Sequence, residues 1–218
     1  MVRKKQPERI REVAAIYDGL GSELYQAANL LEKTSRINLQ NKMMSMERQA
    51  ETATVKLREI TARMVEADTS AVYSEIADVL GIAVEECNDW LKITVPAILP
   101  KKYSKDNVSF LMRPLRHALV EFQRENTLPR FGECAICIVH CYDVALGENR
   151  VRDYDNIETK RYLDVIEAAF LTNDSGRLCT VLQTTAMAEK DRTIFYVMPP
   201  QRLQKWVEKQ WGEDTRNV

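Results

Sequence analysis

Apolar residues in the first part of the chain recur every three or four positions, which is the spacing of an amphipathic helix. Two such stripes follow one another between Pro7 and about Ala67, in a stretch rich in good helix formers. Their members are Ile10, Val13, Ala14, Tyr17, Leu20, Leu24, Ala27, Ala28 and Leu31, then Leu39, Met43, Met46, Ala50, Ala53, Leu57, Ile60 and Met64. Thr34-Ser35 and Asn38 lie between the stripes and are suited to end one helix and cap the next. The pattern predicts an antiparallel helical hairpin, an arm over residues 1–68.

Two helices packed on each other alone do not bury both of these stripes. We therefore expect the arm to pack on the rest of the chain or on a second copy, and a structural or oligomerising role without chemistry is its favoured interpretation. A short helical connector is predicted over residues 69–89, beginning at Thr69 or Ser70 and stopped by Gly81. A helix–turn–helix motif over residues 70–91 is an alternative that no other feature supports.

After Trp90 the apolar pattern changes from a period of 3.6 to a period of 2, and short strands alternate with amphipathic helices. The predicted strands are Leu91 to Val95, Glu133 to Tyr142, Leu178 to Thr185 and Arg192 to Met198, and the predicted helices are Phe110 to Phe122, Asn156 to Phe170 and Gln201 to Trp211. The order β-α-β-α-β-β behind an all-helical arm predicts an α+β fold. Residues 90–218 are expected to form one small domain with a mixed sheet and a C-terminal helix.

The composition sets limits on compartment and partners. The 218 residues carry a net charge of −1, and no apolar run approaches the roughly 20 residues of a membrane span. The basic start has no apolar core after it, so we expect no secretory signal, a cytoplasmic protein and five reduced cysteines. A net charge this close to zero does not indicate the basic face that is typical of DNA-binding proteins.

The segment most suggestive of chemistry is Arg152-Asp153-Tyr154-Asp155-Asn156, just before a predicted helix. Asp153 and Asp155 are two residues apart in an extended lead-in, so both side chains are able to point to one side. Carboxylate oxygens of this kind are ligands that Mg²⁺ prefers. A role limited to helix capping and turn formation is the simpler alternative on composition alone, with Asp155 or Asn156 as the N-cap.

The same stretch resembles the RusA family of Holliday junction resolvases. The resemblance rests on Asp153-Tyr154-Asp155-Asn156, then Lys160, Asp164 and Asn173-Asp174, together with the flanking strands and helices over about residues 90–198. Two departures stand out. Lys160 follows Asn156 by four residues where the family usually has three, which rotates it by about 100° on a helix. Asn173 stands where many members have Asp.

The resemblance implies a metal-dependent endonuclease that acts as a homodimer on branched DNA. It assigns Asp153, Asp155 and Asp174 as ligands of Mg²⁺ (or Mn²⁺), and Lys160 as the cation that offsets charge growing at the phosphorus or the leaving oxygen. Candidates for contacts with DNA phosphates are Lys101, Lys102, Lys105, Arg113, Arg116, Arg150 and Arg152. The alternative is a non-catalytic module that binds DNA or protein. In it the helical arm makes the interactions, and the nuclease-like half is an inactive scaffold.

Cysteine and histidine residues offer a second, weaker metal hypothesis. Cys134, Cys137, His140 and Cys141 lie close together in the sequence, but positions three apart on a strand face opposite sides of a sheet. We therefore expect buried thiols in a core strand rather than a zinc site. His117 is expected to pack or to lie at the surface.

Overall fold

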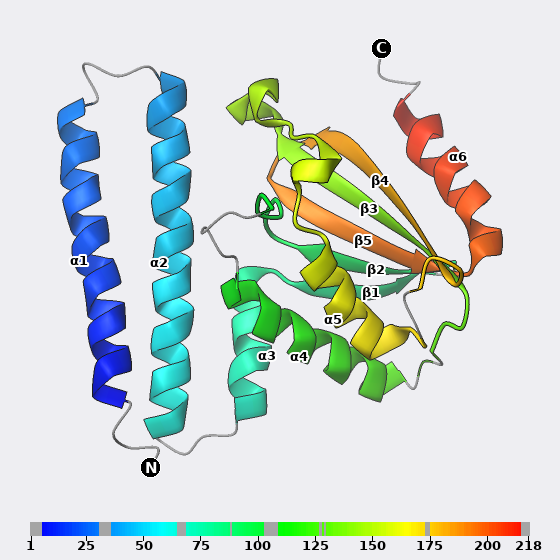
Figure 1. Ribbon diagram of the computed structural model, residues 1–218, viewed down its shortest axis with the longest axis horizontal. Helices are drawn as coiled ribbons and strands as arrows, with labels where there is room; N and C mark the ends of the chain where they lie inside the picture. The colour runs from blue at the N-terminus through cyan, green and yellow to red at the C-terminus, as the bar shows by residue number, and fades with distance from the viewer. Residues whose placement is uncertain are drawn as a thin grey trace.

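The computed structural model describes residues 6–30, 36–64, 69–87, 89–102, 109–126, 128, 130–172 and 175–214. The first two helices, α1 (Gln6–Leu30) and α2 (Arg36–Met64), run antiparallel beside each other at one end of the molecule (Figure 1). Buried residues seven apart on each helix form the seam between them: Val13, Leu20 and Ala27 on α1, and Met46, Ala53 and Ile60 on α2. The predicted helical hairpin is thus confirmed.

The rest of the chain is built on a five-stranded mixed sheet in the order β1-β2-β5-β3-β4. The strands are β1 (Ala83–Cys87), β2 (Trp90–Val95), β3 (Cys134–Asp143), β4 (Cys179–Ala188) and β5 (Arg192–Met198). Strands β3 and β4 are parallel, and every other neighbouring pair is antiparallel. The α+β prediction is confirmed.

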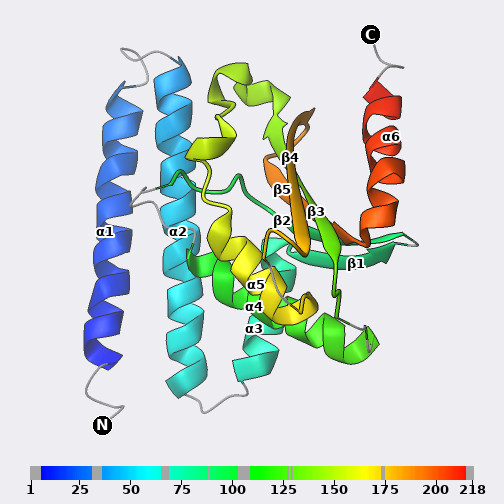
Figure 2. The same ribbon diagram turned by 45° about the vertical axis from the view of Figure 1, so that its right-hand side comes forward.

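Helices cover both faces of this sheet, which explains the nearly continuous apolar run of β3. Alternate residues such as Cys134, Ile136 and Ile138 face the side covered by α3 (Thr69–Leu80), α4 (Ser109–Asn126) and α5 (Lys160–Phe170). Residues between them, such as Cys137 and Val139, face the side where Trp206 of α6 (Leu203–Asp214) packs (Figure 2). A strand buried on both faces shows no apolar–polar alternation.

Two predicted boundaries are wrong, both for reasons of tertiary pairing. The helix predicted from Thr69 or Ser70 to a stop at Gly81 is confirmed as α3, but the rest of the predicted connector is wrong, because Ala83–Cys87 forms β1, which pairs with β2 as a hairpin and belongs to the sheet. The helix predicted from Asn156 begins at Lys160 instead. Ile157, which is buried, forms an antiparallel bridge with Lys101 and so holds the chain extended before the helix.

The directions of the strands bring several chain segments to one end of the sheet, across the strand ends rather than along an outer strand. This end is here called the carboxyl edge. Strands β2, β3 and β4 end there, at Val95, Asp143 and Ala188, and β5 begins there at Arg192. The Asp153–Asn156 segment follows β3 and therefore lies near this edge. In the part of the chain described above, no helix is long and apolar enough to cross a membrane.

Candidate functional site

The loop that leaves β3 at the carboxyl edge is held in place by one carboxylate, Asp191. Its Oδ1 atom accepts hydrogen bonds from the backbone N–H of Asp143 at 2.9 Å and from Nη1 of Arg150 at 3.2 Å, and its Oδ2 atom pairs with Nη2 of Arg150. Both side chains of this ion pair are largely buried. Asp191 thus ties the end of β3, the following loop and the β4–β5 turn together.

A second clamp fixes the segment that carries the two aspartates. Tyr154–Asn156 forms a single 3-10 turn, preceded by Asp153 in an extended conformation. Beyond it, the N–H of Lys102 donates to the carbonyl of Asn156 at 2.8 Å, and the N–H of Glu158 donates to the carbonyl of Pro100 at 2.9 Å. The expected capping role of Asp155 or Asn156 is wrong, because Thr159 precedes the first turn of α5.

Between the two aspartates, Tyr154 is 40% exposed and packs its ring against the sheet. Its ring stacks on His140 of β3 with centroids 5.8 Å apart, and its Oη atom lies 3.1 Å from Oγ1 of Thr185 on β4. His140 is fully buried, and its Nε2 atom lies 3.1 Å from Oε1 of Gln183. Burial lowers the pKa of His140, so the imidazole is neutral at neutral pH.

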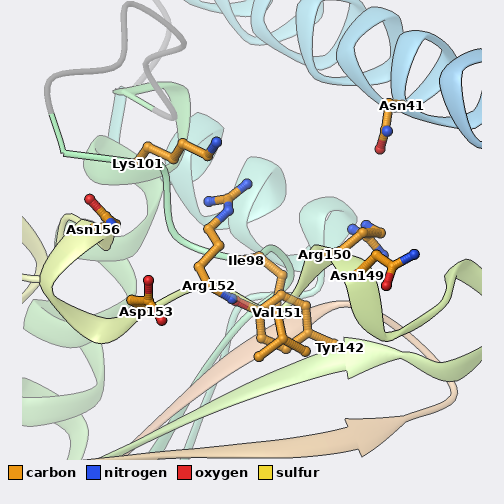
Figure 3. A pocket seen from close by; sticks show the side chains of 10 residues that line it. All are labelled: Asn41, Ile98, Lys101, Tyr142, Asn149, Arg150, Val151, Arg152, Asp153 and Asn156. Atoms are coloured by element: carbon orange, nitrogen blue, oxygen red, sulfur yellow. The ribbon is translucent and has the colours of Figure 1, made fainter.

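A hollow of about 550 Å³ opens between this loop and helix α2 (Figure 3). Lys101 and Arg152 extend into it, and Asn41 points toward it from α2 on the opposite side. Ile98, Tyr142, Asn149, Arg150, Val151, Asp153 and Asn156 complete its lining. The arm therefore contributes directly to the wall of the hollow.

Donors of hydrogen bonds and positive charge dominate the hollow. Lys101, Arg150 and Arg152 line it together with the carboxylate of Asp153; the charge of Arg150 is offset by its ion pair with Asp191, so Lys101 and Arg152 are the cations that face the space. Arg152 is oriented by two contacts: its Nη1 atom donates to the carbonyl of Leu99 at 2.8 Å, and its backbone N–H donates to Oη of Tyr142 at 3.2 Å. A hollow of this character suits an anion such as a phosphate.

The structure brings only part of the predicted site to the hollow. Asp153 lines it, whereas Asp155, two residues on, does not. Both carboxylates are exposed, and neither makes an ion pair or hydrogen bond with another residue that the structure describes. Lys160 is the first residue of α5, and its Nζ atom lies 3.2 Å from Asp164 Oδ1, in an exposed pair along the helix.

The other predicted phosphate contacts are spread over the surface. Lys102 is exposed next to the hollow, while Arg113 and Arg116 are exposed on α4. Arg113 lines a separate, smaller cavity with Arg9, Glu12, Lys56 and Ile60. Lys105 lies outside the described residues.

Asp174, the predicted third carboxylate, also lies outside the described residues. Its described neighbours are placed at the edge of the sheet opposite the carboxyl edge: Thr172 donates its N–H to the carbonyl of Phe131 at 2.9 Å, and the Ser175 carbonyl accepts from Cys179 at the start of β4. No group of three or more His, Cys, Asp or Glu side chains suited to a metal ion occurs among the residues described.

The thiols behave as the strand pattern predicts. Cys134 and Cys137 belong to the cores on opposite faces of the sheet, and the four cysteines of β3 and β4 are buried. Burial raises the pKa of Cys137 to about 12, and burial assisted by Cys179 does the same for Cys134. These groups are protonated thiols at neutral pH and poor metal ligands.

Sequence reasoning missed several residues of this site. Asp191 lies alone in the β4–β5 turn, without a motif around it, and only the arrangement of strands brings it to Arg150. Asn41 belongs to a helix that the pattern assigns to a separate arm. Tyr142 carries no signal beyond its place on a buried strand, and the sequence draws attention to His140 only as a neighbour of cysteines.

Comparison with known proteins adds a family. A family model described as "Family of unknown function (DUF6100)" matches residues 3–217. The chain belongs to this family. The DUF6100 match includes the arm as well as the sheet, so the two parts form one sequence unit in the family.

Other comparisons contribute little to function. No curated protein matches the chain. Among solved structures, the periplasmic domain of Helicobacter pylori MotB is similar at 10% identity, with 62% of this chain and 89% of that chain covered. Its TM-score of 0.35 is too low to carry an argument.

Proposed function

We propose that this DUF6100 protein is a Mg²⁺-dependent endonuclease that cleaves branched DNA. The observation that carries the proposal is the hollow at the carboxyl edge, which is lined by the carboxylate of Asp153 and by the cations Lys101 and Arg152. A site that cleaves a phosphodiester with a metal ion needs both kinds of group, because cations bind the phosphate and carboxylates bind the metal. The resemblance of the Asp153–Asn156 segment to the RusA family supports the same reading.

The donor set fits a magnesium ion. Asp153 and Asp155 flank a tyrosine whose ring packs against the sheet and are exposed, so their oxygens are open to an ion that keeps several water ligands. These two carboxylates would hold the ion, with Asp174 as the third ligand that the resemblance assigns. When bound, Mg²⁺ supplies Lewis acidity and lowers the pKa of a coordinated water.

The chain's own cations would orient the scissile strand. Arg152 is fixed by its bond to the Leu99 carbonyl and is aimed into the hollow, so its guanidinium is placed to bind a phosphate oxygen (Figure 3). Lys101 faces the same space from the neighbouring segment. The proposed role of Lys160 rests on the resemblance alone, since its partner in the structure is Asp164.

The resemblance implies a homodimer, and the proposal includes it. Strand β3 is ten residues long, which corresponds to about 33 Å, and it separates Asp143 from the edge where Thr172 and Ser175 lie. Twofold symmetry would then give two sites for paired cuts in opposed strands.

The test is cleavage by the purified full chain. Labelled four-way junctions, splayed duplexes and plain duplex are incubated with Mg²⁺ or Mn²⁺, and nicking of branched substrates is the expected result. Asp155→Asn should abolish it with the circular dichroism spectrum unchanged. Glu125→Gln, an exposed change on α4, is the matched control and should cleave normally. Absence of metal-stimulated cleavage on every substrate overturns the proposal.

A second candidate is a non-catalytic binding module built on the same hollow. It is favoured by the lack of a three-residue metal cluster in the described parts of the chain. It predicts binding to branched or single-stranded DNA that is independent of divalent metal, without nicking. The cleavage experiment separates the two candidates when binding is measured alongside it.

A further inference from the structure

One side of the helical arm carries apolar residues that the described residues of the chain leave about half exposed. On α1, Ile10, Tyr17 and Leu24 are seven residues apart, and on α2 Met43 and Leu57 follow the same period with Ala50 between them. The five large side chains are between 39% and 49% exposed. This set, with Ala14, Gly21 and Ala28, is here called the arm face.

The two helices present these residues on the same side. Oη of Tyr17 lies 3.1 Å from Oγ1 of Thr54, and Thr54 is one helical turn from both Ala50 and Leu57. Tyr17 and Ala50 lie three positions from the buried seam residues Leu20 and Ala53, which is about one sixth of a turn on each helix. The arm face therefore adjoins the seam along one exposed side of the hairpin.

We propose that the arm face binds the arm face of a second copy of the chain, so that two hairpins form a four-helix bundle. The residues Ile10, Ala14, Tyr17, Gly21 and Leu24 are spaced by four and three in turn, which is the pattern that packs one helix on another. Small residues alternate with large ones, so the large side chains of one copy fit over the small positions of the other.

The size of the arm face is right for such a dimer. Helix α1 has 25 residues and is about 37 Å long, and two helices side by side are about 20 Å wide. The surface covered on each copy is thus about 700 Å², close to the roughly 800 Å² per partner of stable protein interfaces. A short peptide or a single turn of helix would leave most of this face exposed.

Charges beside the arm face favour an antiparallel second copy. The ion pair of Glu12 with Lys56 places residue 58 of α2 level with the start of α1, so Arg11 and Arg58 flank the same end. Glu47 lies toward the other end, where Lys42 Nζ is 3.4 Å from Oε1 of Gln26. When one copy is turned end over end, its basic end meets the acidic part of the other.

The test is the mass of the full chain in solution, measured by light scattering or sedimentation at micromolar concentration without metal or DNA. The wild type is expected to have twice the mass of one chain. Leu24→Lys with Leu57→Lys should give a monomer at the same concentration, because four like charges would then meet in the interface. Val79→Lys with Val120→Lys, at exposed apolar sites on α3 and α4 outside the arm face, is the control and should remain dimeric.

Circular dichroism checks that each variant is folded. A monomeric wild type, or a dimer that survives the Leu24/Leu57 double change, overturns the proposal. A second pair of variants tests the orientation: Glu47→Lys should weaken the dimer, and adding Arg58→Glu should restore it. Failure of the second change to restore dimerisation overturns the antiparallel arrangement. None of these readouts involves DNA cleavage, so the inference stands or falls separately from the proposed function.

Discussion

The ring of Tyr154 stacks on the buried imidazole of His140, with centroids 5.8 Å apart and planes inclined by 29°. Tyr154 is the residue between Asp153 and Asp155, so this contact anchors the middle of the segment to β3. The hydrogen bond between Tyr154 Oη and Thr185 Oγ1 extends the anchor to β4. The position of both carboxylates therefore depends on a tyrosine that itself has no charge.

Two replacements of Tyr154 distinguish the contribution of its ring stacking from that of its hydrogen bond. Tyr154→Phe keeps the stacking and loses one exposed hydrogen bond, so we expect the free energy of unfolding to fall by less than about 1 kcal/mol. Tyr154→Ala loses the ring as well and should cost about 1–2 kcal/mol. Urea unfolding measures both values, and equal losses would contradict the stacking account. If the proposed nuclease activity holds, only Tyr154→Ala should reduce it strongly.

The buried His140 predicts a dependence of stability on pH. Burial lowers its pKa below the usual 6.5, so the unfolded chain binds a proton at higher pH than the native protein does. The contribution of neutral, buried His140 to the free energy of unfolding is fully present above about pH 6.5. It is lost as the pH falls from there toward the lowered pKa of the native protein. The slope attributable to this group reaches at most about 1.4 kcal/mol per pH unit. Urea unfolding between pH 7.5 and about pH 5 should show the slope in the wild type and a shallower one in His140→Gln.

Removal of Asp191 should damage the fold more than removal of an exposed acid. Asp191→Ala leaves Arg150 largely buried without its partner and frees the Asp143 N–H, so we expect a loss of about 3 kcal/mol. Asp164→Ala breaks the exposed pair with Lys160 and should cost less than about 0.5 kcal/mol. Thermal or urea unfolding measures the difference, and similar losses for the two variants would show that Asp191 is not the clamp described above.

Charges in the hollow should govern the salt dependence of DNA binding. Lys101→Ala and Arg152→Ala each remove one cation, so the slope of log affinity against log salt should fall by about 1 for each. Lys209→Ala, on α6 beside Trp90, removes a cation from the other face of the sheet and serves as control. Fluorescence anisotropy with branched DNA gives the slopes. Unchanged slopes for both hollow variants would place the nucleic acid elsewhere.

The cysteines predict a simple labelling result. Cys134, Cys137, Cys141 and Cys179 are buried and Cys87 is half-buried, so a thiol reagent should modify at most Cys87 rapidly in the native protein. The other four should react only after denaturation. Rapid modification of two or more thiols under native conditions would contradict the packing of β3 between its two cores.

Much of the architecture is predictable because the apolar period is a local property. The stripes of α1 and α2 and the switch of period after Trp90 follow from residues that are near each other in the sequence, and the structure confirms them. The strand β1 escapes such reasoning, because Ala83–Cys87 has two exposed glutamates and becomes a strand through its partner β2. The late start of α5 has the same cause, since the bridge from Lys101 to Ile157 joins distant segments.

The site is less predictable than the fold. The sequence draws attention to Asp153 and Asp155 through their spacing, and to several cations through their type. It does not indicate that Arg150 is committed to Asp191, that Arg152 is aimed into the hollow, or that Asn41 of the arm faces it. Each of these depends on contacts across 40 or more residues, which only the folded chain brings about.

The double attachment of the loop after β3 has a consequence for binding. Asp191 holds its beginning through Asp143 and Arg150, and the backbone of residues 100–102 holds its end through Asn156 and Glu158. The chain entropy of this loop is therefore lost during folding, before any ligand arrives. A ligand that enters the hollow meets a preorganised surface, so its affinity is not reduced by the cost of ordering the loop.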